Sequence, residues 1–100
     1  MWVLAARFDL HVGAATSLKE KRRVLRPILD GLRSRFNVGA AEVDGQDLWQ
    51  RAGIGVAFVG ADAAVLRRAL QQVERFVAQH PGLEILDVTE SLYQTDDDLQ

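Results

Sequence analysis

The side chains that could do acid–base chemistry are few and poorly placed for it. The histidines are His11 and His80, and their positions do not match a metal-ligand spacing. Asp9 and His11 alternate onto one strand face and could form a dyad with a hydroxyl, but no G-x-S-x-G elbow accompanies them. A solvated or interface pair is the favoured interpretation. With no cysteine in the chain, we expect a non-enzymatic protein without a metal site or a cofactor.

The glycine spacings do not form a nucleotide-binding loop. The segment 55–60 has the G-x-x-x-x-G spacing, but Ala61 and Asp62 stand where a phosphate loop needs Lys and Ser or Thr. Gly53 and Gly55 lack the third glycine of the dinucleotide fingerprint. These glycines are interpreted as positions of close packing on a sheet.

Charge is distributed unevenly along a chain whose net charge is only −2. Residues 17–36 hold seven basic and two acidic residues, and residues 81–100 hold six acidic and no basic ones. At about 100° per residue, Lys19, Arg22, Arg26 and Arg33 fall within roughly 60° on a helix, whereas Lys21 lies on the other flank. Such a stripe fits a phosphate backbone, and a solvated helix face is the alternative. The candidate nucleic-acid-binding residues are Lys19, Lys21, Arg22, Arg23, Arg26 and Arg33.

Hydrophobic periodicity places these residues on an ordered set of elements. Alternation predicts strands over 3–12, 38–43 and 52–59, and a period near 3.6 predicts helices over 17–36 and from Asp62 to about His80. Ser17 and Glu20 have the spacing of a capping box, Asn37 is a helix end, and Pro27 predicts a kink in the first helix. The fourth strand, 83–93, shows a shift of phase that either a β-bulge or burial on both faces would explain.

The predicted order βαββαβ indicates an α+β fold, a ferredoxin-like sandwich. It has a four-stranded antiparallel sheet with two helices on one face. The 100 residues, 48% hydrophobic and 26% charged, suit one domain over 1–94, followed by an acidic flexible tail over 95–100. Neither a signal peptide nor a membrane span is recognisable, so we expect a cytoplasmic protein.

The uncovered sheet face is the second candidate surface. Its strand residues are small, so a second sheet could approach closely, and tryptophan and arginine are common interface anchors. Trp49 has an alternative interpretation, as a hairpin residue folded over its own sheet edge. The candidate interface residues are Val3, Ala5, Trp49, Arg51, Gly53 and Gly55.

Four segments resemble one family. They are 17–23 (SLKEKRR), 33–38 (RSRFNV), 41–43 (AEV) and 48–52 (LWQRA), and together they resemble the YlxP-like family of small bacterial proteins, a domain-of-unknown-function family. The resemblance covers residues 1 to about 93 and leaves the tail Asp96 to Asp98 outside the pattern. It implies the same fold and no established activity. The family's genes commonly lie near those for translation initiation and ribosome maturation, which implies a connection with RNA or the ribosome.

Two functional hypotheses follow. The first is an RNA- or ribosome-associated protein that uses the basic helix. The second is a homodimeric protein-interaction or small-ligand regulatory module that uses the sheet face. They require different residues, the helix cations for the first and Val3, Gly53, Gly55 and Trp49 for the second.

Overall fold

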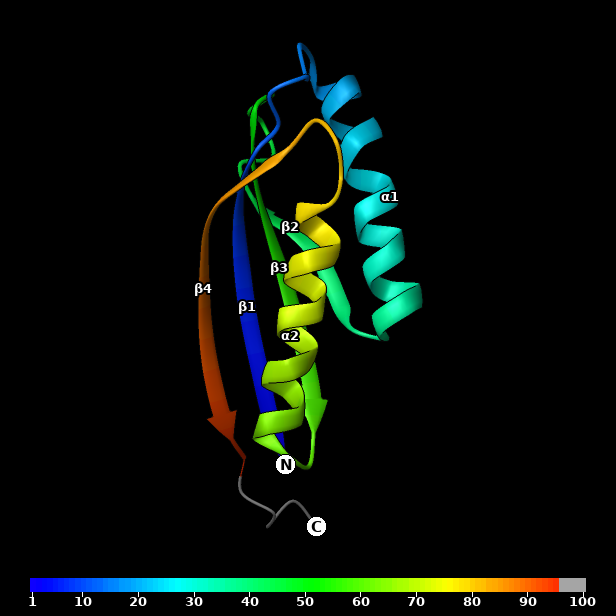
Figure 1. Cartoon of the computed structure of the whole chain (residues 1–100). Helices are drawn as coiled ribbons and strands as arrows, with labels where there is room; N and C mark the ends of the chain where they lie inside the picture. Colours follow the sequence, from blue (N-terminus) through cyan, green and yellow to red (C-terminus); the bar gives the residue numbers. More distant parts are fainter. Residues whose placement is uncertain (96–100) are drawn as a thin grey trace.

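A computed structural model describes residues 1–95 and confirms the ferredoxin-like fold. The elements follow in the order β1(Trp2–His11) α1(Leu18–Phe36) β2(Gly39–Asp44) β3(Arg51–Gly60) α2(Ala63–Ala78) β4(Glu84–Gln94). The predicted segments differ from these bounds by one or two residues at their ends. Both helices cover the same face of the sheet and leave the other face open (Figure 1).

The four strands form one antiparallel sheet in the order β2-β3-β1-β4. β1 is therefore central although it comes first in the chain, and β2 and β4 form the two edges. α1 packs over β2, whereas α2 packs over the three remaining strands. The N-terminal half of α1 thus lies at the outer side of the molecule, beside an edge strand.

The helix ends follow the predicted caps. Ser17 Oγ accepts a hydrogen bond from the Glu20 backbone N–H at 3.1 Å, as in a capping box. The Glu20 carboxylate departs from that pattern, because it accepts from the N–H and the hydroxyl of Thr16, both at 2.9 Å. Asn37 ends α1 in the left-handed conformation with φ 54°, and Asp62 caps α2 by accepting two backbone N–H bonds.

Two strands contain register shifts. In β4 the pairing with β1 shifts between Asp9 and Leu10, which confirms the predicted bulge and leaves Leu86 as the extra residue. β2 shifts against β3 between Glu42 and Asp44, so Val43 is extra there. This second bulge determines which side chains of β2 lie over the glycines of β3 on the open face.

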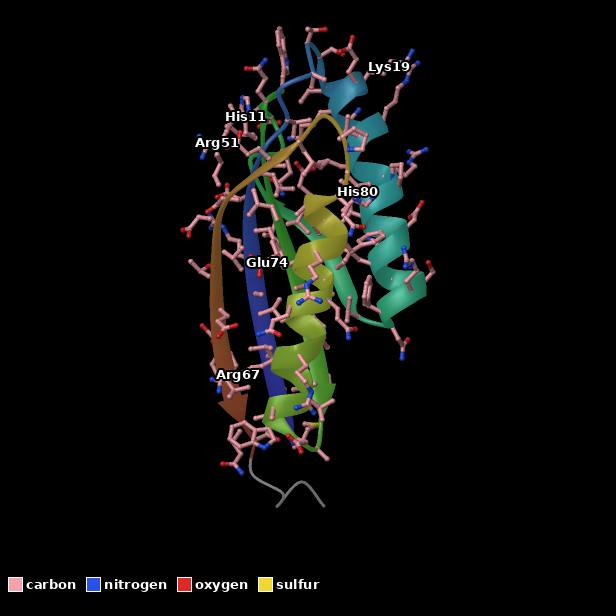
Figure 2. All side chains as sticks on the ribbon, in the orientation of Figure 1. His11, Lys19, Arg51, Arg67, Glu74 and His80 are labelled. Atoms are coloured by element: carbon pink, nitrogen blue, oxygen red, sulfur yellow. The ribbon has the colours of Figure 1, made fainter. Side chains whose placement is uncertain are left out.

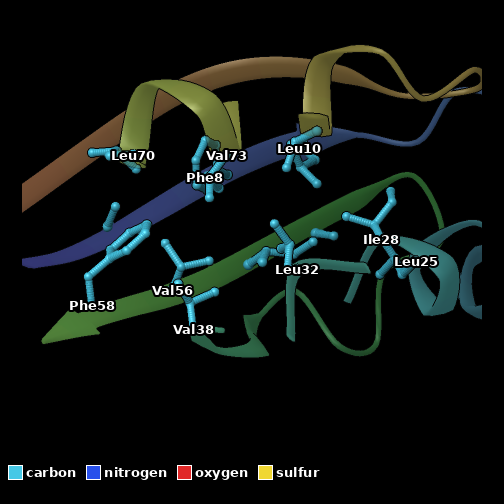
Figure 3. Packing of buried hydrophobic residues seen from close by; sticks show 14 of the residues in the cluster. Phe8, Leu10, Leu25, Ile28, Leu32, Val38, Val56, Phe58, Leu70 and Val73 are labelled. Atoms are coloured by element: carbon cyan, nitrogen blue, oxygen red, sulfur yellow. The ribbon is translucent and has the colours of Figure 1, made fainter. Parts of the chain in front are cut away.

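The hydrophobic core lies between the sheet and the two helices (Figure 3). Phe8 and Leu10 of β1, at the centre of the sheet, are fully buried, as the period of two predicts. α1 and α2 meet through aromatic rings, with Phe36 and Phe76 edge to face at 5.4 Å between centroids. The buried hydrophobic residues are Leu4, Ala6, Phe8, Leu10, Val12, Ala15, Leu25, Ile28, Leu32, Val38, Ala52, Ile54, Val56, Phe58, Leu66, Leu70, Val73 and Val77.

α1 continues through Pro27, whose side chain is exposed on the outer side, where its helical phase places it. The kink itself stays a prediction. At the end of the fourth strand, Thr95 is hydrogen-bonded through its N–H to the Met1 carbonyl at 2.9 Å. The rest of the predicted acidic tail, 96–100, lies outside the described residues.

Candidate nucleic-acid interface

Four basic residues form an exposed surface on the N-terminal half of α1, which we call the basic face: Lys19, Arg22, Arg23 and Arg26. Together with Pro27 they line a shallow hollow of about 430 Å³. Lys19 lies at the N-terminal end of the helix and points away from the sheet (Figure 2). The structure therefore brings these four predicted residues together on one surface.

A second hollow, of about 200 Å³, lies between α1 and the edge strand β2. Arg22 and Arg26 line both hollows and so separate them. The floor of the second hollow includes the buried Leu25 and the half-buried Leu29. Asp30 and Glu42 also line the second hollow, so an extended anion would meet Arg22 and Arg26 from the first hollow, whose lining is free of carboxylates.

The charges of this surface are largely uncompensated. Within residues 1–95, no carboxylate lies within 4.0 Å of the cationic groups of Lys19, Arg22 or Arg26. The nearby Glu20 is occupied by Thr16, whose hydrogen bonds, with a smaller contribution from the charge of Arg23, lower the pKa of the Glu20 carboxyl. The positive potential of the basic face is therefore available to a partner.

Arg33 belongs to the predicted stripe but has a structural task. Its Nε and Nη2 donate to the Ala40 carbonyl of β2 at 3.0 and 2.7 Å, and its Nη1 lies 3.6 Å from Asp30. The guanidinium thereby ties the C-terminal half of α1 to the edge strand. Because its planar donor group is already engaged, Arg33 is a weaker candidate for phosphate contact than the four residues of the basic face.

Lys21 was predicted to help from the other flank, and the structure corrects this prediction. Its side chain is 1% exposed, and its Nζ donates to the carbonyls of Gly45, Leu48 and Arg51 at 2.6, 2.7 and 3.1 Å. Glu42 Oε2 lies 2.7 Å from the same nitrogen. This contact is an ion pair without a hydrogen bond, because the three N–H groups of the ammonium are directed at the carbonyls. Lys21 therefore binds the β2–β3 loop, residues 45–50, and is shielded from any external phosphate.

A signal for this role was present in the sequence. Lys21 lies four residues before Leu25 and seven before Ile28, and all three occupy the buried stripe of α1 with Leu32. A lysine on the apolar stripe of a helix needs internal hydrogen-bond acceptors, because burying an unpaired ammonium group is costly. Helical phase could therefore have separated Lys21 from the exposed cations.

The open sheet face is less flat than its sequence predicts. A Cβ on Gly53 would lie 2.9 Å from the Asp44 Cβ, and one on Gly55 would lie 2.9 Å from the Val43 Cγ1. The bulge in β2 places these side chains over the two glycines, so Gly53 is buried and Gly55 is half-buried. The interpretation as close packing suits both, and neither offers a smooth surface to a second sheet.

The other predicted interface residues separate into two regions. Val3 and Ala5 are half-buried. Val3 pairs with Val59 on one side and Tyr93 on the other, and these three form an apolar row across the sheet in which Val59 is 64% and Tyr93 56% exposed. Trp49 and Arg51 lie at the opposite end of β3 and are both exposed. Trp49 is 54% exposed, and its interpretation as a hairpin residue folded over its own sheet edge stays a prediction.

The remaining titratable groups form local contacts. Arg7 Nη2 lies 2.9 Å from Asp9 Oδ1 and 3.4 Å from Asp44 Oδ2. Asp9 is therefore ion-paired with Arg7 and does not form the dyad with His11 that the strand alternation allows. The hydrogen bond to Asp9, together with its charge, raises the pKa of the Arg7 guanidinium. His80 Nδ1 lies 2.7 Å from the Phe76 carbonyl at the end of α2. Among the described residues, no cluster of three or more His, Asp or Glu side chains could hold a metal ion.

The fold and the surface together define the class of this protein, a small ferredoxin-like domain with a basic first helix. Solved structures support the fold alone. A de novo designed ferredoxin-fold protein matches with a TM-score of 0.55 at 6% identity, over 100% of this chain and 91% of the other. The acylphosphatase of Bacillus subtilis matches with a TM-score of 0.50 at 15% identity, over 98% of this chain and 91% of the other.

Sequence comparison identifies the family. Residues 3–90 match the family model described as "Protein of unknown function (DUF503)". The uncharacterised protein YlxP of Bacillus subtilis (strain 168) is 41% identical over 70 residues, which cover 70% of this chain and 76% of that protein. The chain belongs to this family, as the resemblance in residues 17–52 indicates.

Neither α1 nor α2, the helices of residues 1–95, combines the length and the apolar character needed to cross a bilayer.

Proposed function

We propose that this protein binds RNA through the basic face of α1, with Lys19, Arg22, Arg23 and Arg26 contacting phosphates, and that the ribosome is the source of that RNA. The observation that supports this proposal is the uncompensated charge of Lys19, Arg22 and Arg26 within the described residues. Lys19 lies in the first turn of α1, where the helix macrodipole disfavours a cation, so its placement costs stability that a bound polyanion would recover. The family's implied link to translation supports the choice of the ribosome.

The open sheet face is a poor alternative surface for RNA. RNA-recognition domains with this strand order stack bases on aromatic residues of the central strands. Along β1 and β3, both wholly within the described chain, the outward positions hold no Phe, Tyr or Trp. The outward-facing Arg7 is engaged with Asp9 and Asp44. Phosphate contact from the helix is therefore the mode that the side chains support.

The test is co-sedimentation with ribosomes and separated subunits over a salt series. The test variant carries Lys19→Glu, Arg22→Glu and Arg26→Glu. The matched control carries Arg67→Glu, Arg68→Glu and Arg75→Glu, which makes the same charge change at exposed positions of α2. Each lost phosphate contact should reduce the slope of log K against log salt by about 0.7 to 0.9, hence by about 2 to 3 for the test variant.

Two results would contradict the proposal. If the native protein does not bind at low salt, the basic face is an ordinary solvated surface. If both triple variants lose binding equally, the interaction depends on net charge and is not located on α1. Circular dichroism of each variant must first show that the fold is retained.

A second candidate function is self-association through the apolar row of Val3, Val59 and Tyr93, of which Val59 and Tyr93 are more than half exposed. The rest of the open face argues against full overlap of two sheets, because Asp9, Asp44 and Asp87 outnumber Arg7 there and two copies would bring surfaces of like net charge together. Sedimentation equilibrium of the native protein and of Tyr93→Asp tests this candidate. A native protein that stays monomeric at about 100 µM would exclude it, because its dimer would then have a Kd weaker than about 100 µM, too weak for a specific interface.

A further inference from the structure

We propose that the 45–50 loop is a rigid platform on which an unpaired RNA base stacks against Trp49, beside the basic face of α1. This inference rests on the proposed function and deepens it, because it specifies RNA with an unpaired nucleotide next to the phosphates that α1 contacts.

The first observation is that the loop is fixed although it is on the surface. Lys21 Nζ binds the carbonyls of Gly45, Leu48 and Arg51, at both ends and in the middle of the segment. The Leu48 N–H donates to the Gly45 carbonyl at 3.0 Å, which closes a turn inside the loop. The backbone directly before and after Trp49 is therefore held in place.

Gln50 attaches the other side of Trp49 to the segment between β1 and α1. Its carbonyl accepts from the Val12 N–H at 2.8 Å, and its Nε2 donates to the Ala15 carbonyl at 3.4 Å. The loop is thus joined to both the end of β1 and the segment that leads into α1. A loop anchored in this way loses little conformational entropy on binding, which favours affinity.

The second observation is an apolar ring held in solvent by this rigid support. Trp49 is 54% exposed, and the neighbouring Leu48 is also 54% exposed. The buried Lys21 holds the loop in a conformation that leaves the Trp49 ring exposed, and a ring held in this way is available to a binding partner. Tryptophan offers a large flat face on which any nucleobase can stack.

The third observation is that the platform and the cations lie at one end of the molecule. Leu48 O is 2.7 Å from Lys21 Nζ, so the Cα of Trp49 lies within roughly 12 Å of the Cα of Lys21 by covalent dimensions. Lys19 and Arg22 lie on the same two turns of α1 as Lys21. Figure 2 shows Lys19 and Arg51, which follows Trp49 by two residues, at this same end.

An exposed aromatic ring at the same end of the molecule as exposed cations is the chemistry that binds single-stranded nucleic acid, although the loop itself also carries the exposed Asp47. Arg51 is exposed, and within residues 1–95 its side chain has no carboxylate partner within 4.0 Å. Arg51 would hold the phosphate next to the base that covers Trp49, and Arg22 would hold phosphates further along the strand, towards the basic face. A strand leaving a duplex on α1 would reach the loop within a few nucleotides.

The test uses tryptophan fluorescence in a Trp2→Phe background, so that Trp49 is the remaining tryptophan of the chain. The probes are a blunt 12-base-pair RNA duplex, the same duplex with a four-nucleotide uridine overhang, and the same overhang made abasic. We expect the uridine overhang to quench Trp49 emission and to bind more tightly than the other two probes.

The variant is Trp49→Leu, whose site is exposed, so the fold is retained. Because it has no tryptophan in this background, its affinity and those of the other variants are measured by the fluorescence anisotropy of end-labelled RNA. Its affinity for the overhang RNA should fall about 5- to 150-fold, the range measured for one base–aromatic stack, with blunt-duplex affinity unchanged. Trp49→Phe should recover part of the loss. The control is Val65→Ala, an exposed apolar residue of α2, which should bind all three probes like the parent protein.

Equal binding of all three probes, with no change in Trp49→Leu, would overturn this inference and leave phosphate binding by α1 intact. An equal loss for blunt and overhang RNA in Trp49→Leu would also overturn it, because the base would then play no part. Failure of the parent protein to bind any probe at low salt would instead remove the proposed function itself.

Discussion

Replacing Lys21 by methionine is expected to destabilise the protein strongly while the exposed lysine two residues earlier tolerates the same change. Methionine keeps most of the apolar stem that Lys21 buries. It removes the ammonium group that three loop carbonyls and Glu42 surround. The perturbation therefore isolates the charged hydrogen bonds from the packing of the side chain.

The size of the expected loss of stability follows from the buried groups that lose their partner when the ammonium group is removed. Breaking a buried ion pair by removing one partner costs about 3–5 kcal/mol, because the other partner stays buried and uncompensated. Glu42 keeps 21% of its side chain exposed, and the carbonyls belong to a surface loop, so water can partly replace the ammonium group. We therefore expect a loss at the lower end, about 3 kcal/mol.

Urea unfolding followed by circular dichroism measures this loss. With an m-value of about 1.5 kcal/mol/M, the midpoint should fall by about 2 M. Lys19→Met, on the exposed surface, should change stability by less than about 0.5 kcal/mol. The double variant Lys21→Met, Glu42→Gln should recover about 1 kcal/mol, because it removes the stranded carboxylate. A cost below about 1 kcal/mol for Lys21→Met would refute the claim that this lysine anchors the loop.

Three further predictions concern the helices. Gly31→Ala should destabilise by about 1 kcal/mol in thermal unfolding despite the higher helix propensity of alanine, because the new Cβ would lie 2.5 Å from the Phe76 ring; a gain in stability would contradict this. Asp62→Ala should cost about 1 kcal/mol in urea unfolding through loss of the α2 cap, and Asp62→Asn should recover most of it. The lowered pKa of Glu20 means that its contribution to stability is complete above the unfolded-state pKa and disappears as the pH falls through the lower folded-state value. Glu20→Gln should therefore reduce the dependence of the urea midpoint on pH below pH 5, and an unchanged acid limb would show that the bonds to Thr16 contribute nothing.

Most of the fold could be predicted from the sequence because each element carries its own periodic signal. The alternation of β1 and the apolar stripes of both helices are long enough to fix their type and their buried face. The shifted phase of 83–93 indicated a bulge, and the pairing of β4 with β1 contains one. β2 has only six residues, so its own bulge at Val43 left no periodic trace.

The candidate site was predictable only in part, for related reasons. The exposure of Lys19, Arg22 and Arg26 follows from their helical phase, which a single sequence contains. The burial of Lys21 also follows from phase, but its acceptors come from a loop more than 20 residues away, which spacing along a helix cannot reveal. The covering of Gly53 by Asp44 likewise depends on a strand pairing that the sequence does not specify.

The order of the strands has a consequence for how the chain folds. β1, which is synthesised first, pairs on one side with β3 and on the other with β4, and Trp2 meets Gln94 in that second pairing. Contacts between such distant segments give a high contact order, so loop-closure entropy must be overcome before the central strand gains its neighbours. We expect folding in milliseconds or longer, slower than for helical domains of this size. A nascent chain that has not yet released β4 exposes one whole edge of β1, and this edge is where a chaperone or an aggregating strand would attach.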